Sequence, residues 1–181
     1  MSVILLYVHP SIRGRISEEF VWQMYMLLFI SIVLIPILSI FIVKKSGFIQ
    51  SVQMKNRKER IIPFTIIGLM MFISSFKLID NSGLAICGWW ILSAGIALWL
   101  TVPLLIFWGK PSAHMLPMGA AVALFMHEGY VWASNDMLFI SGIAILCAGF
   151  VASSRLFLKA HTNKELIVGT ILGILVILPM L

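Results

Sequence analysis

The sequence predicts an all-α integral membrane protein, a bundle of about six transmembrane helices whose polar chemistry lies at one membrane interface. Two observations indicate the membrane. Of the 181 residues, 61% are hydrophobic and only 11% are charged, and the mean hydropathy is +1.06, whereas soluble domains carry about 25% charged residues. A third observation selects helices, because the apolar runs are continuous and lack the alternation of barrel strands. A water-soluble fold is therefore excluded.

Six apolar segments approach or reach the length that a helix needs to cross a bilayer, about 17 to 25 residues. We predict helices near Phe20 to Val43, Ile61 to Ile79, Leu84 to Trp108, Met115 to Ala133, Met137 to Ser153 and Glu165 to Leu181. The chain shows no internal repeat and no soluble second domain, so we expect a single membrane-embedded domain over residues 1–181. Residues 1–19 mix turn formers with charge and are expected to form an interfacial N-terminal segment.

The loops between these spans differ sharply in charge. Because each span moves the chain across the membrane, the loops Lys44 to Arg60, Gly109 to His114 and Ser154 to Lys164 share one face. Ten basic residues lie there: Lys44, Lys45, Lys55, Arg57, Lys58, Arg60, Lys110, Arg155, Lys159 and Lys164. The positive-inside rule alone would explain such a bias and would place this face in the cytoplasm.

The loop Lys110-Pro111-Ser112-Ala113-His114 leads directly into the fourth predicted span. Its backbone N–H groups and the Ser112 hydroxyl would then lie at a helix N-terminus, where anions bind favourably. The alternative is an ordinary helix cap beside an interfacial histidine. This segment alone does not decide between the two.

A second polar pattern runs from Ser154-Arg155 through His161 to Glu165. His161 and Glu165 are spaced i, i+4, so the carboxylate can fix one imidazole nitrogen and leave the other free to attack. Arg155 carries a planar guanidinium group that can donate two parallel hydrogen bonds to phosphate oxygens. In the alternative interpretation Glu165 belongs to a capping box with Thr162, and its carboxylate accepts a hydrogen bond from the backbone N–H of Thr162.

The third pattern is the basic run from Lys55 to Pro63, which otherwise reads as juxtamembrane charge. Together the three patterns resemble the signature of the type 2 phosphatidic acid phosphatase superfamily, which is related to vanadium haloperoxidases. That signature reads Lys, six residues, Arg-Pro; then Pro-Ser-Gly-His; then Ser-Arg, five residues, His, three residues, Asp. In this chain the three motifs occur in the same order and lie on one predicted face of the membrane, as they do in the family. The resemblance covers Lys55 to Glu165.

The resemblance implies a role for each matched residue. His161 would be the nucleophile that forms a phosphohistidine, His114 the general acid for the departing oxygen, and Glu165 the group that orients His161. The residues implied in phosphate binding are Lys55, Arg60, Ser112, Ala113 and Arg155. Two histidines that divide these roles, with cations to neutralise the transferred group, form a sensible site for phosphoryl transfer. No metal and no cofactor is expected.

Three positions depart from the family pattern. Ile62 stands where the signature has arginine, and three nearby basic residues are candidates to replace that charge: Arg57, Lys58 and Arg60. Ala113 replaces a glycine, which would be strained at positive φ unless a short helical turn forms there. Glu165 replaces aspartate and is one methylene longer.

We therefore expect a lipid phosphate or diphosphate phosphatase, acting on polyprenyl diphosphate, phosphatidylglycerol phosphate, phosphatidic acid or a lipid A phosphate. The alternatives are a lipid phosphotransferase and a non-catalytic membrane protein that binds anionic lipids. A zinc site built from His114, His161 and Glu165 is conceivable, but the adjacent cations argue against it. The expected partners are the phospholipid or polyprenyl phosphate substrate and the bilayer, with no nucleic acid.

The expected location is a bacterial inner (plasma) membrane, which the chain crosses several times. The two indicators of sidedness disagree. The basic loops point to the cytoplasm, whereas the family resemblance implies an extracytoplasmic active site.

Overall fold

The computed structural model describes residue 22, residues 25–26 and 29–49, residue 54, and residues 56–80 and 85–180. Within these ranges the chain forms helices joined by short turns and contains no strand. The predicted all-α class is therefore confirmed for the described residues. The predicted interfacial segment, residues 1–19, the start of the first predicted span, and Lys55 lie outside them.

The described elements follow one another in the order predicted for the spans. They are η1 Ile30–Leu34, α3 Ile35–Lys45, η2 Arg57–Arg60, α4 Ile61–Ile79, α5 Ala85–Phe107, α6 Met115–Val131, α7 Asn135–Phe157, α8 Asn163–Ile177 and η3 Leu178–Met180. The predicted end of the fifth span at Ser153 is wrong, because α7 continues to Phe157. No proline or glycine interrupts Ser154 to Phe157, so the helix extends and carries Arg155 on its last turn.

Three of the described helical segments are long and apolar enough to cross a membrane: Arg57–Ile79, Cys87–Phe107 and Asn135–Phe157. The third is the least buried by the rest of the protein, at 11% of its apolar window. Its outer surface exposes large rings such as Phe150 and Phe157, which are 75% and 87% exposed. Apolar surface on this scale is compatible with a membrane protein, because lipid would cover it.

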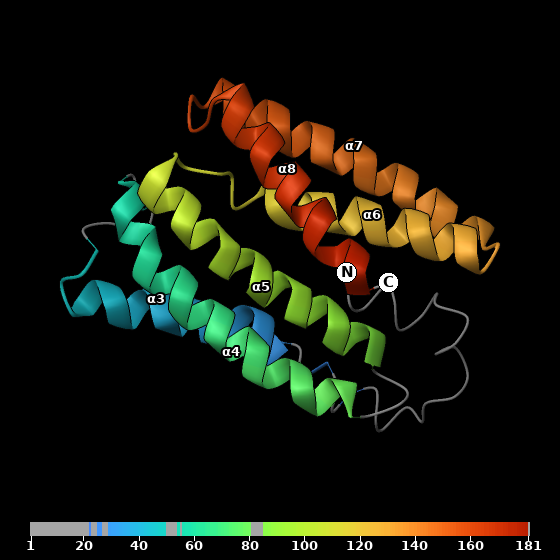
Figure 1. The fold of residues 1–181 in the computed structure, drawn as a ribbon, viewed down its shortest axis with the longest axis horizontal. Coiled ribbons are helices and arrows are strands. Elements are labelled where there is room, and N and C mark those ends of the chain that lie inside the picture. Colours follow the sequence, from blue (N-terminus) through green and yellow to red (C-terminus); the bar gives the residue numbers. More distant parts are fainter. Residues whose placement is uncertain are drawn as a thin grey trace.

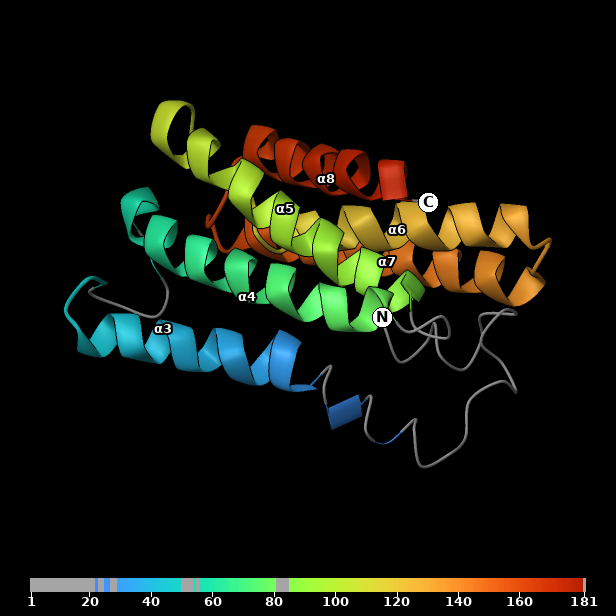
Figure 2. The same ribbon diagram turned by 60° about the horizontal axis from the view of Figure 1, so that its bottom comes forward.

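The helices pack in two groups (Figure 1). Helix α4 packs along α5, and α6 packs against both α7 and α8, while contacts between α5 and α8 join the groups. Helix α3 lies on the outer side of α4, away from α8 (Figure 2). One end of the bundle collects the ends of α5 and α7 and the starts of α4, α6 and α8 (Figure 1). The described parts of the three basic loops therefore lie at a common end, as counting of the predicted spans indicated.

The contact between α6 and α8 depends on glycines. A Cβ on Gly169 would lie 2.7 Å from the Ser112 carbonyl oxygen, and a Cβ on Gly173 would overlap the Leu116 carbonyl oxygen. From the other helix, a Cβ on Gly119 would overlap the Thr170 carbonyl. The backbones can approach this closely only because these residues lack side chains. The contact presses the first turns of α8 against the turn that precedes α6.

We predict that Gly173→Ala destabilises the protein by about 1–3 kcal/mol, because the added methyl group forces α6 and α8 apart. The matched control is Gly142→Ala on α7, where a Cβ would meet nothing within 4 Å. That change should be neutral or stabilising by roughly 0.5–1 kcal/mol. Thermal unfolding in detergent measures both, and equal midpoints for the two variants would contradict the predicted role of the close contact.

Candidate functional site

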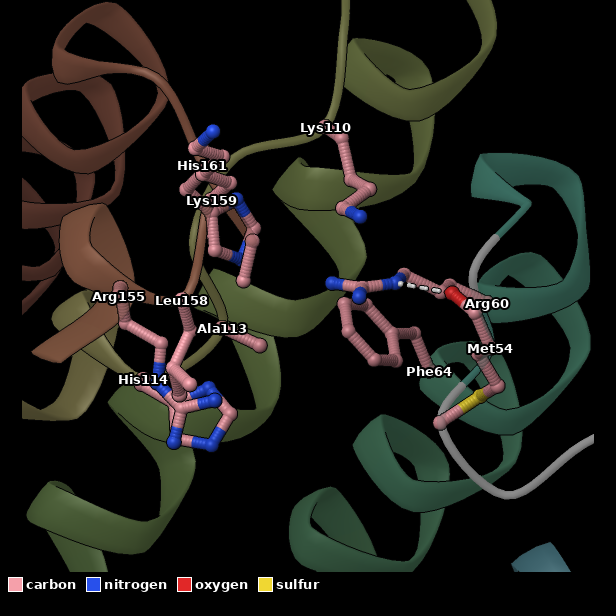
Figure 3. A pocket seen from close by; sticks show the side chains of 11 residues that line it. Met54, Arg60, Phe64, Lys110, Ala113, His114, Arg155, Leu158, Lys159 and His161 are labelled. Atoms are coloured by element: carbon pink, nitrogen blue, oxygen red, sulfur yellow. Dashed lines mark hydrogen bonds between the residues drawn. The ribbon is translucent and has the colours of Figure 1, made fainter.

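A cavity of about 660 Å³ opens at the end of the bundle where the basic loops meet. Its wall combines residues from the start of α4, from the α5–α6 connection and from the end of α7 with the following loop (Figure 3). The lining residues are Met54, Arg60, Phe64, Lys110, Ala113, His114, Arg155, Leu158, Lys159, Ala160 and His161. Five of the eight predicted site residues are therefore brought together here: Arg60, Ala113, His114, Arg155 and His161.

His161 lies in the loop between α7 and α8 and is only 8% exposed. Its Nδ1 lies 3.4 Å from Oε2 of Glu165, which is longer than a typical hydrogen bond, and Nδ1 has no hydrogen-bond partner among the described residues. The same Oε2 accepts a hydrogen bond from the Thr162 N–H at 2.9 Å, and the Glu165 N–H donates to Thr162 Oγ1 at 3.4 Å. The capping box is thus confirmed, and one carboxylate serves both the cap and the imidazole.

This arrangement favours one tautomer of His161. A carboxylate beside Nδ1 stabilises a proton on that nitrogen, so the lone pair resides on Nε2. The loop therefore holds on the cavity wall an imidazole whose lone pair is on Nε2.

Ser112 does not line the cavity. Its side chain is fully buried, and its Oγ accepts a hydrogen bond at 3.4 Å from the N–H of Met115, the first residue of α6. Its own N–H donates to the Glu165 carbonyl at 3.0 Å, which ties the start of α6 to α8. Its neighbour Ala113 lies in a turn and is not among the described residues with positive φ, so replacement of the family's glycine causes no strain of that kind.

Arg60 brings a cation to the side of the cavity formed by α4. Its Nε donates to the Met54 carbonyl at 3.2 Å, and the guanidinium extends from there across the cavity (Figure 3). Ile62, at the position where the signature has arginine, is 38% exposed and does not line the cavity. Of the three candidates for the missing charge, Arg60 alone lines the site, since Arg57 and Lys58 do not.

Arg155 lies on the opposite wall, on the last turn of α7. Its side chain lies beside His114 in the close view of the cavity (Figure 3). Its Nε is buried and makes no hydrogen bond to any described residue. A buried donor on a charged group without a partner is costly, so this wall of the site suits an anionic ligand.

Two lining cations, Lys110 and Lys159, were not predicted as site residues. Lys110 extends from the α5–α6 connection toward the Arg60 guanidinium (Figure 3). Burial and the nearby Arg60 charge lower the pKa of Lys110, although Glu165 opposes them. The available sequence signal was its place directly before Pro111, at the start of the segment that leads into α6.

Lys159 adopts a left-handed conformation, with φ of +50°. It ends α7 in a Schellman arrangement, in which the Ala160 N–H donates to the Arg155 carbonyl at 3.0 Å and the Lys159 N–H to the Leu156 carbonyl at 2.9 Å. Glycine usually occupies this position, and a side chain there costs about 1 kcal/mol. The chain therefore places a lysine on the cavity wall at some expense of stability.

The electrostatics of the site favour neutral histidines. The pKa of His114 is lowered by partial burial and then by the charges of Arg155 and Arg60. The pKa of His161 is lowered by burial, by Lys110 and by Arg60, and the opposing effect of Glu165 is too small to reverse this. Both imidazoles are thus easier to deprotonate than a free histidine.

The described residues contain no group of three or more His, Cys, Asp or Glu side chains that could hold a metal ion. The alternative zinc site of His114, His161 and Glu165 is therefore not assembled. Comparison of the chain with models of protein families, with curated proteins and with solved structures finds no match.

We predict that Lys159→Gly stabilises the fold by about 1 kcal/mol, because glycine adopts positive φ without strain. The same change should weaken binding of inorganic phosphate by about two- to fivefold through loss of a lining cation. Lys164→Gly is the matched control, since it removes the same charge from an exposed helical residue outside the cavity. It should destabilise the protein by roughly 0.5–1 kcal/mol and leave phosphate binding unchanged. Thermal unfolding measures the change in stability, and titration with inorganic phosphate measures the change in binding. A lower unfolding midpoint for Lys159→Gly than for the parent protein would contradict this account.

Proposed function

We propose that the protein is a lipid phosphate phosphatase that works through a phosphohistidine on His161. The observation that carries this proposal is the composition of the cavity wall. Two histidines with lowered pKa values share it with four cations, and no carboxylate is among the described lining residues. Such a wall favours an anion with several negative oxygens and provides both a nucleophile and a proton donor.

The proposed reaction has two steps. Nε2 of His161 attacks phosphorus, and the bond to the leaving oxygen breaks with its electron pair passing to that oxygen, which takes a proton from His114. Water then attacks the phosphohistidine, His114 accepts a proton from it, and inorganic phosphate leaves with Nε2 restored. Glu165 stabilises the imidazole ring as it gains positive charge, while Arg60, Lys110, Arg155 and Lys159 neutralise the transferred group.

The proposal includes a membrane setting. We propose that all six predicted spans cross the bilayer, with the cavity at one interface of a bacterial inner membrane. An amphiphile's head group would enter the cavity from that interface while its chains stay in lipid. A lipid phosphotransferase would use the same first step and replace water by an alcohol in the second.

We predict that His161→Ala abolishes phosphate release from a panel of lipid phosphates in mixed micelles, a loss of at least about 10³-fold. His127→Ala is the matched control, because His127 lies near the other end of α6 and does not line the cavity. It should retain the parent activity. Folded parent protein that is inert toward every lipid phosphate offered would contradict the proposal, as would activity that survives His161→Ala.

We predict that, for a lipid phosphate monoester, kcat/KM is highest below pH 6.5 and falls as the pH rises. The general acid His114 must be protonated, and its lowered pKa means that the proton is lost earlier than from a free histidine. The nucleophile His161 must be neutral, and its lowered pKa keeps it neutral at acidic pH. A pH profile measures this, and a maximum above pH 8 would contradict the assigned roles.

A further inference from the structure

We infer that Met54, which belongs to none of the three sequence patterns, is a positioning residue that holds Arg60 in the cavity through its backbone carbonyl. The left-handed backbone of Met54 directs that carbonyl at the Arg60 guanidinium, and the guanidinium presents its free end to the bound phosphate. This inference rests on the proposed function of the cavity as a phosphate site, and it names a residue outside the family resemblance on which that site depends.

Arg60 lies on the cavity side of α4, whereas Ile62 does not. Successive helical residues are rotated by about 100°, so residue 62 lies roughly 200° around the helix from residue 60. Phe64, about one turn after Arg60, shares its face and also lines the cavity. Burial lowers the pKa of both His114 and His161, and among the charges that add to this effect Arg60 acts on both. Its position therefore matters to the whole site.

The Arg60 side chain has to be held if it is to meet an anion at one place. A long side chain loses much rotamer freedom when it is fixed, and the cavity of about 660 Å³ leaves room for other conformations. Its Nε donates to the Met54 carbonyl at 3.2 Å. The two terminal nitrogens then point away from Met54 into the cavity (Figure 3), where they can donate paired hydrogen bonds to phosphate oxygens.

The backbone of Met54 is in an unfavourable conformation, with φ of +44°. Among the described residues other than glycine, positive φ occurs at Met54, Ala133 and Lys159, and the first and last of these line the cavity. Ala133 lies in the turn between α6 and α7, at the other end of the bundle. Unfavourable backbone conformations that persist at a site indicate a functional constraint. At Met54 that constraint is the carbonyl, which has to face Arg60.

The test replaces Met54 by two isomeric side chains. Leucine and isoleucine contain the same atoms, but isoleucine is branched at Cβ, and β-branched residues tolerate positive φ least. In a calorimetric titration of the purified protein with inorganic phosphate, Met54→Ile should bind at least about fivefold more weakly than Met54→Leu, as expected when a hydrogen bond to a charged group is lost. Equal affinities of the two folded variants would overturn the inference.

A double variant separates positioning from a general disturbance of the fold. Arg60→Met should weaken phosphate binding by about tenfold. Adding Met54→Leu or Met54→Ile to Arg60→Met should then give affinities within about twofold of each other, because the carbonyl no longer has a guanidinium to hold. A difference as large as in the presence of Arg60 would overturn the inference. Ala133→Ile, the control at the distant left-handed position, should lower the unfolding midpoint and leave phosphate affinity unchanged.

Histidine titration followed by NMR provides a second measurement. Because the Arg60 charge helps to lower the pKa of both His114 and His161, displacement of its guanidinium should raise both values in Met54→Ile relative to Met54→Leu. Identical values in the two variants would contradict the assigned role.

If Met54→Ile does not fold, Arg60→Lys decides. Lysine keeps the charge, but its one terminal nitrogen cannot bind the Met54 carbonyl and also present two further nitrogens to phosphate. It should bind phosphate at least about fivefold more weakly than the parent protein, and parental affinity would overturn the inference. These measurements need no turnover. A parent protein that binds phosphate but hydrolyses no lipid phosphate would contradict the proposed function alone, whereas a parent protein that binds no phosphate would overturn both.

Discussion

The close contact between α6 and α8 is the constraint on which the rest of the site depends. Gly169 and Gly173 allow the α8 backbone to reach the turn before α6, and the Ser112 N–H then donates to the Glu165 carbonyl. That hydrogen bond joins the segment that carries His114 to the helix whose first turn orients His161. Two histidines that are 47 residues apart in the chain are thereby held on one wall. Side chains at the glycine positions would separate them.

The bundle separates its polar chemistry from a largely apolar exterior. Phe150 and Phe157 on α7 face outward, while the lining cations gather at one end, where helix termini meet. In the proposed membrane setting this end would lie at an interface, where the long side chains of Arg60 and Lys110 keep access to water and to head groups, whereas charge in the middle of a bilayer would be costly. If the protein acts on lipid phosphates as proposed, the phosphate would be bound at that boundary, and the lipid would not have to leave the membrane.

Sequence analysis predicted the helices and much of the site for a simple physical reason. Apolar length predicts the spans, and the predicted spans determine which loops share an end, so His114, Arg155 and His161 were expected to meet. Ser112 was assigned to phosphate binding by resemblance, but its buried hydroxyl accepts a hydrogen bond from the first N–H of α6. The sequence does not reveal on which side of a turn a hydroxyl lies. Lys159 was not expected, because loop lysines have a general explanation in membrane topology, and its left-handed backbone is a property of the folded loop.

The carboxylate of Glu165 has two neighbours, the Thr162 N–H at 2.9 Å and His161 Nδ1 at 3.4 Å. Because the first contact caps α8, any opening of that first helical turn also moves the group that sets the imidazole tautomer. Helix fraying, which is local and fast in most proteins, is here coupled to the chemical state of His161. On heating, the imidazole would lose its orientation while the rest of the bundle remained folded.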